Sequence, residues 1–167
     1  MNSSLIIPPF TFMIAGALIL PFLPARLRSS AFLLWPALTL LIICITPEGE
    51  IINYYFAGYT LILSSFDPLS TVFGAIFALI ALIGGVYSLN LKDTGQQIAV
   101  LLYAGGAIGV TFAGDFFTLF IFWELMAVSS AWLIWAGRTE ESRKAGMRYI
   151  FVHLFGGGLL LAGILIH

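Results

Sequence analysis

Residues 116–136 read FFTLFIFWELMAVSSAWLIWA, and this stretch decides the fold class of the chain. Twenty of its 21 residues carry no charge, and the exception is Glu124 near the middle. A run of about 20 predominantly apolar residues is the length that a helix needs to cross a hydrocarbon core roughly 30 Å thick. The stretch therefore predicts a transmembrane helix that carries one carboxylic acid at mid-depth.

The whole chain of 167 residues has the composition of a membrane protein. It is 60% hydrophobic and 9% charged, with a mean hydropathy of +1.05, whereas about a quarter of the residues of a soluble domain are charged. A net charge of −1 gives no indication of a nucleic-acid partner. The N-terminus lacks the features of a cleaved signal peptide, so the first apolar run is expected to be retained. The sequence predicts an all-α integral membrane protein of the cell membrane, with residues 1–167 forming a single membrane domain in contact with the lipid bilayer.

Apolar runs separated by charged or turn-forming residues predict about six transmembrane helices. The predicted spans are residues 5–24, 31–46, 69–89, 96–113, 115–136 and 145–166. Between the second and third spans, residues 46–70 are rich in aromatic and β-branched residues, with Gly49 and Gly58 as breakers. This pattern predicts an extended hairpin or an interfacial loop. Asp67 and Asp115 are expected to cap the third and fifth spans.

The charged residues of the connections predict the orientation of the chain. All seven basic residues lie in or next to the first, third and fifth connections: Arg26, Arg28, Lys92, Arg138, Arg143, Lys144 and Arg148. The opposite connections carry acidic residues and neither lysine nor arginine: Glu48, Glu50, Asp67 and Asp115. Loops rich in lysine and arginine stay in the cytoplasm. The N-terminus and the hairpin are therefore predicted to lie outside.

Glu124 and His153 are the candidate functional residues. A charged residue at the centre of a membrane helix costs about 2.5–3.5 kcal/mol on insertion scales, and such residues commonly mark ion or proton paths. At a rise of about 1.5 Å per residue, both side chains are expected near the midplane, on consecutive antiparallel helices. Glu124 is thus a candidate proton carrier and His153 a candidate relay, exchanging protons through one or two waters. The alternatives are a structural hydrogen-bonding glutamate and a packing histidine.

Three stretches also resemble a known family. FDPLSTVFGAIFALIALIGGVYS, GDFFTLFIFWELMAVSSAWLIWAG and RYIFVHLFGGGLLLAG are similar to the antiporter-like membrane subunits of respiratory complex I, of Mrp-type sodium/proton antiporters and of membrane-bound hydrogenases. The resemblance covers about residues 60–166 and is most specific at FWELM, where the essential buried glutamate of the family matches Glu124. It implies a proton path in which this glutamate pairs with a lysine of a later helix, and an N-terminus outside.

The resemblance also implies partners. A full member of the family continues well beyond six helices, and its partner lysine has no counterpart among the seven basic residues here. The implied partners are other membrane subunits of a large complex, including a separate chain that supplies the later helices. A shortened relic packed within a larger assembly is the alternative.

Two functions follow, a proton-path or cation/proton-translocating subunit of such a complex and a non-transporting structural scaffold. A lysine of another chain beside Glu124 would favour transport, and dry apolar packing would favour a scaffold. Neither a cofactor nor a metal is expected, because Cys44 is the only cysteine and the sequence has no Gly-rich nucleotide loop. The chain is thus predicted to contribute to an ion-translocating oxidoreductase or an antiporter without a catalytic redox site of its own.

Overall fold

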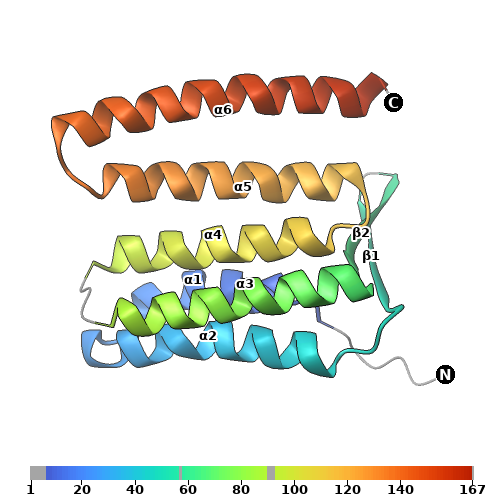
Figure 1. Ribbon diagram of the computed structural model, residues 1–167, viewed down its shortest axis with the longest axis horizontal. Coiled ribbons are helices and arrows are strands. Elements are labelled where there is room, and N and C mark those ends of the chain that lie inside the picture. The colour runs from blue at the N-terminus through green and yellow to red at the C-terminus, as the bar shows by residue number, and fades with distance from the viewer. Residues whose placement is uncertain (1–6, 57, 90–92, 167) are drawn as a thin grey trace.

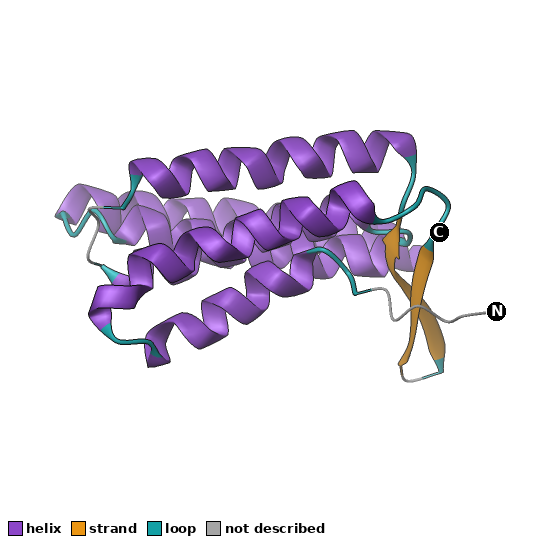
Figure 2. Ribbon diagram, turned by 90° about the horizontal axis from the view of Figure 1, so that it is seen from below, coloured by secondary structure: helices purple, strands orange, loops and turns teal. Residues whose placement is uncertain are grey.

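The computed structural model is a bundle of antiparallel helices aligned with one long axis, and a β-hairpin stands across one end of the bundle (Figures 1 and 2). It describes residues 7–56, 58–89 and 93–166. In chain order the elements are α1 (Phe10–Ile19), the 3-10 helix η1 (Leu20–Phe22), α2 (Ala25–Ile45), β1 (Ile51–Phe56), β2 (Tyr59–Ser65), α3 (Pro68–Tyr87), α4 (Thr94–Phe112), α5 (Phe116–Trp135) and α6 (Glu140–Ile166).

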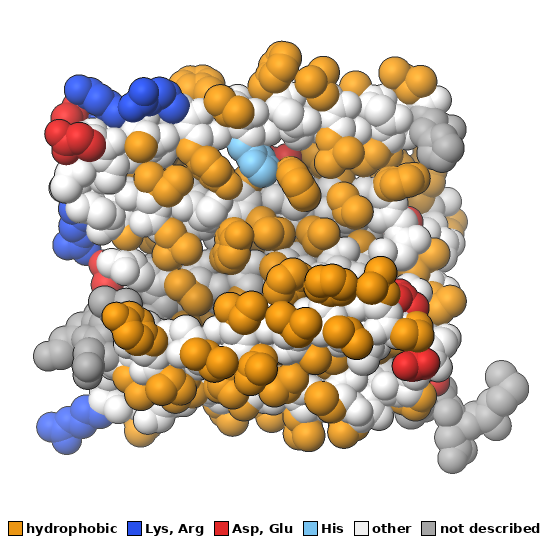
Figure 3. All heavy atoms as spheres, in the orientation of Figure 1, with side chains coloured by type: hydrophobic (Ala, Val, Ile, Leu, Met, Phe, Trp, Pro, Cys, Tyr) orange, Lys and Arg blue, Asp and Glu red, His pale blue; other side chains and the backbone are white. Residues whose placement is uncertain are grey.

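The helices have the lengths and composition of a multi-pass membrane protein. Within the described residues, α2 to α6 are each long and apolar enough to cross a membrane, and Phe10–Phe22 is a shorter apolar helix. Hydrophobic side chains cover the middle of the face seen in Figure 3, whereas lysine and arginine gather at the end that holds the α5–α6 connection. The predicted class of apolar helical membrane protein is therefore confirmed.

The observed helix limits differ from the predicted ones at three places. The first helix is shorter than the predicted range 5–24, because Pro9 stands at its N-cap and Pro21 interrupts it near the end. The second helix starts at Ala25, six residues before the predicted residue 31. Its first turns carry Arg26 and Arg28, whose long side chains can reach out of the apolar layer. Pro36 lies inside this helix without ending it.

The last helix also starts earlier than predicted, at Glu140 instead of residue 145. Thr139 and Ser142 form a reciprocal cap, in which the backbone N–H of each residue donates to the side-chain oxygen of the other at 3.0 Å. The charged run before residue 145 is therefore part of the helix. At about 1.5 Å per residue, a helix of 27 residues is longer than the hydrocarbon core, so its charged first turns can stand beyond it.

Local capping fixes the starts of α3 and α5, as predicted. The Asp67 side chain accepts hydrogen bonds from the backbone N–H groups of Leu69 and Ser70. Asp115 Oδ1 accepts the N–H of Thr118 at 2.8 Å, and its Oδ2 accepts the N–H of Ile62 at 2.6 Å. Asp115 therefore also fastens the hairpin to α5.

The hairpin predicted between the second and third spans is present. β1 and β2 pair antiparallel, with a bulge between Ile52 and Asn53. Gly58 has a φ of +90°, a conformation that glycine adopts without steric cost at a turn. Exposed tyrosines line this hairpin at Tyr54, Tyr55 and Tyr59. Such side chains are typical of the membrane–water interface.

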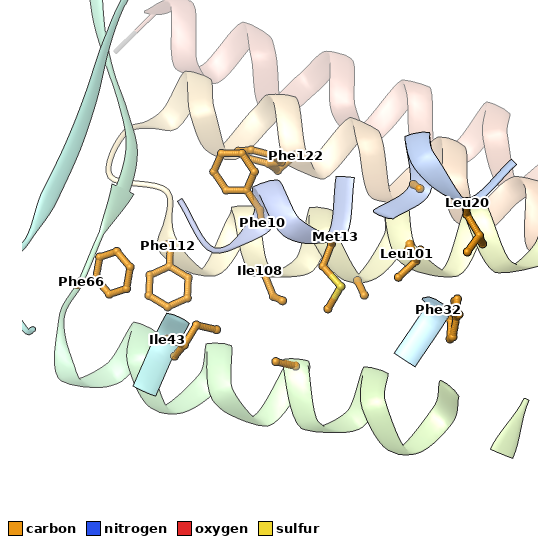
Figure 4. Close-up of a cluster of buried hydrophobic side chains, with 13 residues drawn as sticks. Phe10, Met13, Leu20, Phe32, Ile43, Phe66, Leu101, Ile108, Phe112 and Phe122 are labelled. Atoms are coloured by element: carbon orange, nitrogen blue, oxygen red, sulfur yellow. The ribbon is translucent and has the colours of Figure 1, made fainter. Parts of the chain in front are cut away.

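The core surrounds α4, which packs against α1, α3 and α5. Its buried side chains come from α1 to α5, η1 and the loop before α3 (Figure 4). Two aromatic pairs mark this core, Phe10 with Phe122 at 4.4 Å between ring centroids and Phe66 with Phe112 at 4.8 Å. Gly109 of α4 lies directly against the Phe122 ring, because a side chain there would occupy the same space. Small residues thus bring the helices close together.

Helix α6 lies at the edge of the bundle and packs against α5 (Figure 1). Its outward side chains are strongly exposed, with Val152 at 74% and Phe155 at 72%. Gly156 and Gly158 have open space where a side chain would stand. One long face of α6 is therefore uncovered in the described chain.

Candidate functional site

The structure brings the two predicted site residues together. Glu124 of α5 and His153 of α6 face each other halfway along the bundle, where the histidine and an acidic side chain are visible side by side in Figure 3. Glu124 Oε1 lies 4.0 Å from His153 Nε2. Only 25% of the glutamate side chain and 18% of the histidine side chain are exposed. The expected matching depth on consecutive helices is therefore observed.

The facing atoms of this pair have no hydrogen-bond partner among the described residues. Glu124 Oε1 and His153 Nε2 are both fully enclosed. The 4.0 Å between them exceeds the length of a hydrogen bond, although a small side-chain rotation would close it. A buried polar atom without a partner costs about 1–3 kcal/mol. The pair is therefore arranged so that a proton shared between its members would stabilise both.

Gly157 makes the room for the Glu124 carboxylate. This glycine of α6 is buried, and a side chain there would collide with Glu124 Oε1. Gly157 stands four residues after His153, so both lie on the face of α6 that meets α5. Sequence analysis missed this role, because three adjacent glycines look alike in a sequence. The spacing from His153 was the signal that could have found it.

Aromatic rings hold the histidine from two sides. The centroids of the Trp123 and Tyr149 rings each lie 5.8 Å from that of His153, at interplanar angles of 26° and 30°. The hydroxyl of Tyr149 accepts a hydrogen bond of 2.7 Å from Ser130 Oγ. Ser130, Tyr149, His153 and Glu124 therefore lie next to one another in this order, joined by the hydrogen bond from Ser130 to Tyr149 and the ring contact between Tyr149 and His153. Tyr149 was not predicted, although its position four residues before His153 puts it on the same helical face.

The basic side chains lie at the end of the bundle, away from this pair. Arg138 pairs with Asp93 at 2.8 Å, and Glu140 pairs with Arg143 at 2.8 Å and with Lys144 at 3.6 Å. Across the described ranges, neither a lysine nor an arginine forms an ion pair with Glu124. The cation that the family resemblance assigns to this glutamate would have to come from elsewhere.

The described residues contain no cluster of three or more histidine, cysteine, aspartate or glutamate side chains that could hold a metal ion. Cys44 is exposed on α2. The chemistry that the Glu124 and His153 pair can perform is proton transfer, because both groups gain and lose a proton and they lie within one side-chain movement of each other.

Comparisons with known proteins match part of this chain to a family of membrane proteins. Residues 113–167 match the family model described as NADH:quinone oxidoreductase/Mrp antiporter, transmembrane. This segment contains both Glu124 and His153.

Two curated relatives match longer stretches. An uncharacterized protein of Methanocaldococcus jannaschii is 28% identical over 120 residues, which are 66% of this chain and 25% of that protein. The Na(+)/H(+) antiporter subunit A1 of Staphylococcus aureus is 28% identical over 106 residues, which are 60% of this chain and 13% of that protein. The matched part of this chain thus corresponds to a quarter or less of each relative.

A solved structure has the same fold. One chain of the membrane-bound sulfane sulfur reductase, an archaeal respiratory membrane complex, superposes on this chain with a TM-score of 0.73. The match covers 95% of this chain and 35% of that chain, at 22% identity. Taken together, these findings confirm that the chain is similar to the antiporter-like membrane subunits, and its last third, residues 113–167, matches the membrane family of NADH:quinone oxidoreductases and Mrp antiporters.

Proposed function

We propose that this chain is a proton-path subunit of a multisubunit membrane complex of the Mrp antiporter, membrane-bound hydrogenase or complex I type. Glu124 takes up and releases the proton, and His153 passes it on. The observation that carries this proposal is the enclosed pair of Glu124 and His153, with 4.0 Å between Oε1 and Nε2, halfway along an apolar bundle. Ionisable groups at that depth are expensive and commonly functional.

A cation from a partner chain would give the transfer a direction. In apolar surroundings the neutral, protonated form of a carboxylic acid is favoured, whereas a nearby cation favours the carboxylate. A cation brought beside Glu124 therefore drives its proton toward the imidazole of His153, and withdrawal of the cation lets Glu124 take up another. The line through Tyr149 and Ser130 leads from His153 toward the end of the bundle with the basic residues.

The cation is supplied by a partner chain in this proposal. Within the described ranges Glu124 has no lysine or arginine ion-pair partner, and the outward face of α6 next to the site is uncovered. Later helices from a separate chain, packed on that face, complete the half-channel. The basic end of the bundle faces the cytoplasm of a prokaryotic cell, and the N-terminus and hairpin face outward.

A non-transporting scaffold is the second candidate function. It is favoured by the tight contact at Gly157 and by the aromatic rings of Trp123 and Tyr149 around His153. In that case the Glu124 and His153 pair fastens α6 to α5, and no proton moves along it.

Proton or sodium movement in sealed vesicles separates the two functions. The complex containing this chain is compared with a Glu124→Gln variant, which keeps the shape of the side chain and removes its acid. We expect transport to be lost in the variant, because an amide cannot carry the proton. Glu141→Gln is the matched control, since Glu141 is exposed at the start of α6. Unchanged transport in a Glu124→Gln complex that assembles in wild-type amounts would contradict the proposal and favour the scaffold.

A further inference from the structure

Three hollows adjoin one another around the α5–α6 connection. One, of about 460 Å³, is lined by Arg143, Lys144, Met147 and Arg148. The second shares Arg143 and Met147 with it and is also lined by Trp135, Arg138, Thr139 and Glu140. The third, of about 320 Å³, is lined by Trp135, by Ser129 and by mostly apolar residues of α4, α5 and α6. The shared lining residues make these hollows one continuous groove, from the charged end of the bundle into its apolar middle.

The charged end of this groove fits an anion. The hollow at Arg143, Lys144 and Arg148 is lined by three cations and one methionine, without a carboxylate. Glu140 pairs with Arg143 and Lys144, whereas Arg148 makes no ion pair among the described residues. Arg148 is exposed and stands one turn further into α6 than Lys144. Arg148 therefore offers a positive charge to an anion at this end of the groove.

The apolar end of the groove has the length of an acyl chain. It runs along α5 from Leu125 to Trp135, which is about 15 Å at 1.5 Å per residue. Half of a hydrocarbon core of roughly 30 Å is the depth that the chains of one leaflet fill. Val128 is 67% exposed and Trp132 is 54% exposed, so the groove opens sideways. Trp132 and Trp135 line the end of the groove nearest the α5–α6 connection, and tryptophan is typical of the membrane interface.

We infer that this groove is a binding site for an anionic phospholipid. The phosphate lies among Arg143, Lys144 and Arg148, and one acyl chain lies between Ile98 and Leu102 of α4 and Val128 and Trp132 of α5. Clusters of lysine and arginine at the cytoplasmic end of a membrane helix commonly bind acidic lipid headgroups. The inference is independent of the proposed proton path, because it assigns no role to Glu124 or His153.

Native mass spectrometry of the purified full chain tests the inference. The chain is stripped of lipid and then offered equal amounts of phosphatidylglycerol and phosphatidylcholine. We expect phosphatidylglycerol to be retained in preference, and its retention to fall about fivefold for each charge removed by Arg143→Gln, Lys144→Gln and Arg148→Gln. Arg26→Gln is the matched control, an exposed arginine at the same end of the bundle and outside the three hollows.

A second variant distinguishes a lipid from a soluble anion. Val128→Trp fills the apolar part and leaves every charge in place, so it should lower phosphatidylglycerol retention without changing helicity by circular dichroism. Displacement of the bound lipid by inorganic phosphate would instead mean that only the headgroup is recognised, which contradicts a seated acyl chain. Equal retention of both lipids, or full retention by the triple variant, would overturn the inference.

Discussion

At the scale of single residues, the candidate site depends as much on a missing side chain as on the charged ones. Gly157 leaves the space that the Glu124 carboxylate occupies, and His153 approaches from the same face of α6. The neighbours Gly156 and Gly158 have open space around them. Three consecutive glycines thus have different roles, which only the positions of their neighbours reveal.

Gly157→Ala tests this arrangement. The added methyl group would push the Glu124 carboxylate away from His153, so the proton would have further to travel. We expect transport in sealed vesicles to fall about 10- to 100-fold, the size of effect that a misplacement of about 1 Å can have on a reacting group. Gly158→Ala, where nothing lies within 4 Å of the added group, should transport at the wild-type rate. Equal rates for both variants would show that the Glu124 position is unimportant.

Only some residues of the candidate site could be predicted from the sequence. Glu124 and His153 were predictable, because each is an ionisable group inside a long apolar run and their depths follow from the helical rise. Tyr149 and the particular role of Gly157 were not singled out, because tyrosine and glycine are ordinary in membrane helices, whereas Ser130 forms the helix–helix hydrogen bond that is typical of serine there. Their importance arises from contacts between α5 and α6, and these contacts depend on how the two helices are rotated.

At the scale of the helices, α4 organises the bundle through its glycines. Gly105 faces Met13 of α1, whereas Gly109, one turn later, faces Phe122 of α5. Glycines four residues apart favour close helix packing, but this spacing alone does not show that the two glycines serve different neighbours. Gly106 faces Met126 of α5, so α4 and α5 approach closely over about one turn.

Gly109→Ala should therefore destabilise the bundle. A methyl group there overlaps the Phe122 ring, and overpacking of this kind costs about 1–3 kcal/mol in the free energy of unfolding. Gly84→Ala is the matched control in α3, where nothing lies within 4 Å, and alanine should be neutral or stabilise the helix by up to about 1 kcal/mol. Unfolding by sodium dodecyl sulfate, followed by circular dichroism, measures both. A Gly109→Ala variant as stable as Gly84→Ala would mean that the ring moves aside freely.

The starts of the helices were predictable where they depend on residues nearby in the sequence. Asp67 and Asp115 were predicted as caps because a cap depends on the next three residues alone. The start of α2 was predicted too late, because the arginines before residue 31 were assigned to a connection. At α6 the charged residues precede the predicted apolar span and belong to the same helix.

At the scale of the whole molecule, positive charge distinguishes the two ends of the bundle. The described arginines and the described lysine gather at one end, whereas acidic side chains lie at both ends of the face seen in Figure 3. Positive connections stay in the cytoplasm, so this end is predicted to face inward. The order of the apolar runs predicted the antiparallel arrangement, and the structure bears it out.

Cysteine labelling measures the orientation directly. In a Cys44→Ser background, Glu48→Cys and Glu141→Cys place single thiols at opposite ends of the bundle, at exposed positions. A membrane-impermeant maleimide should label position 48 in intact cells, and position 141 only after the membrane is opened. The reverse pattern would show that the N-terminus lies inside.

The ion pair of Asp93 and Arg138 joins the α3–α4 connection to the α5–α6 connection, and its stabilising effect should depend on pH. The pKa of Asp93 lies below its ordinary value of 3.8, because the backbone N–H of Gln96 donates to its carboxylate, as do the N–H of Gly95 and the Arg138 guanidinium. A lowered pKa in the folded state means that this stabilisation is present above pH 3.8 and is lost as the pH falls through the folded-state value.

We therefore expect the unfolding temperature in detergent to fall below about pH 4, with a smaller fall for Asp93→Asn, whose amide does not titrate. Part of the fall should remain in that variant, because hydrogen bonds from the N–H groups at the start of α3 also lower the pKa of Asp67. Glu141→Gln serves as the control. Identical pH dependence in the wild type and in Asp93→Asn would exclude a stabilising role for this carboxylate.

The position of α6 has a consequence for the order in which the protein is assembled. The buried core is built from side chains of α1 to α5 with η1 and the loop before α3, and α6 joins it through α5. The first five helices can therefore close around α4 while α6 is still being synthesised. Helix α6 carries His153 and Gly157 of the candidate site. Its uncovered face remains free to pack against another membrane helix. Folding of the bundle and completion of the proton site are in this sense two separate events.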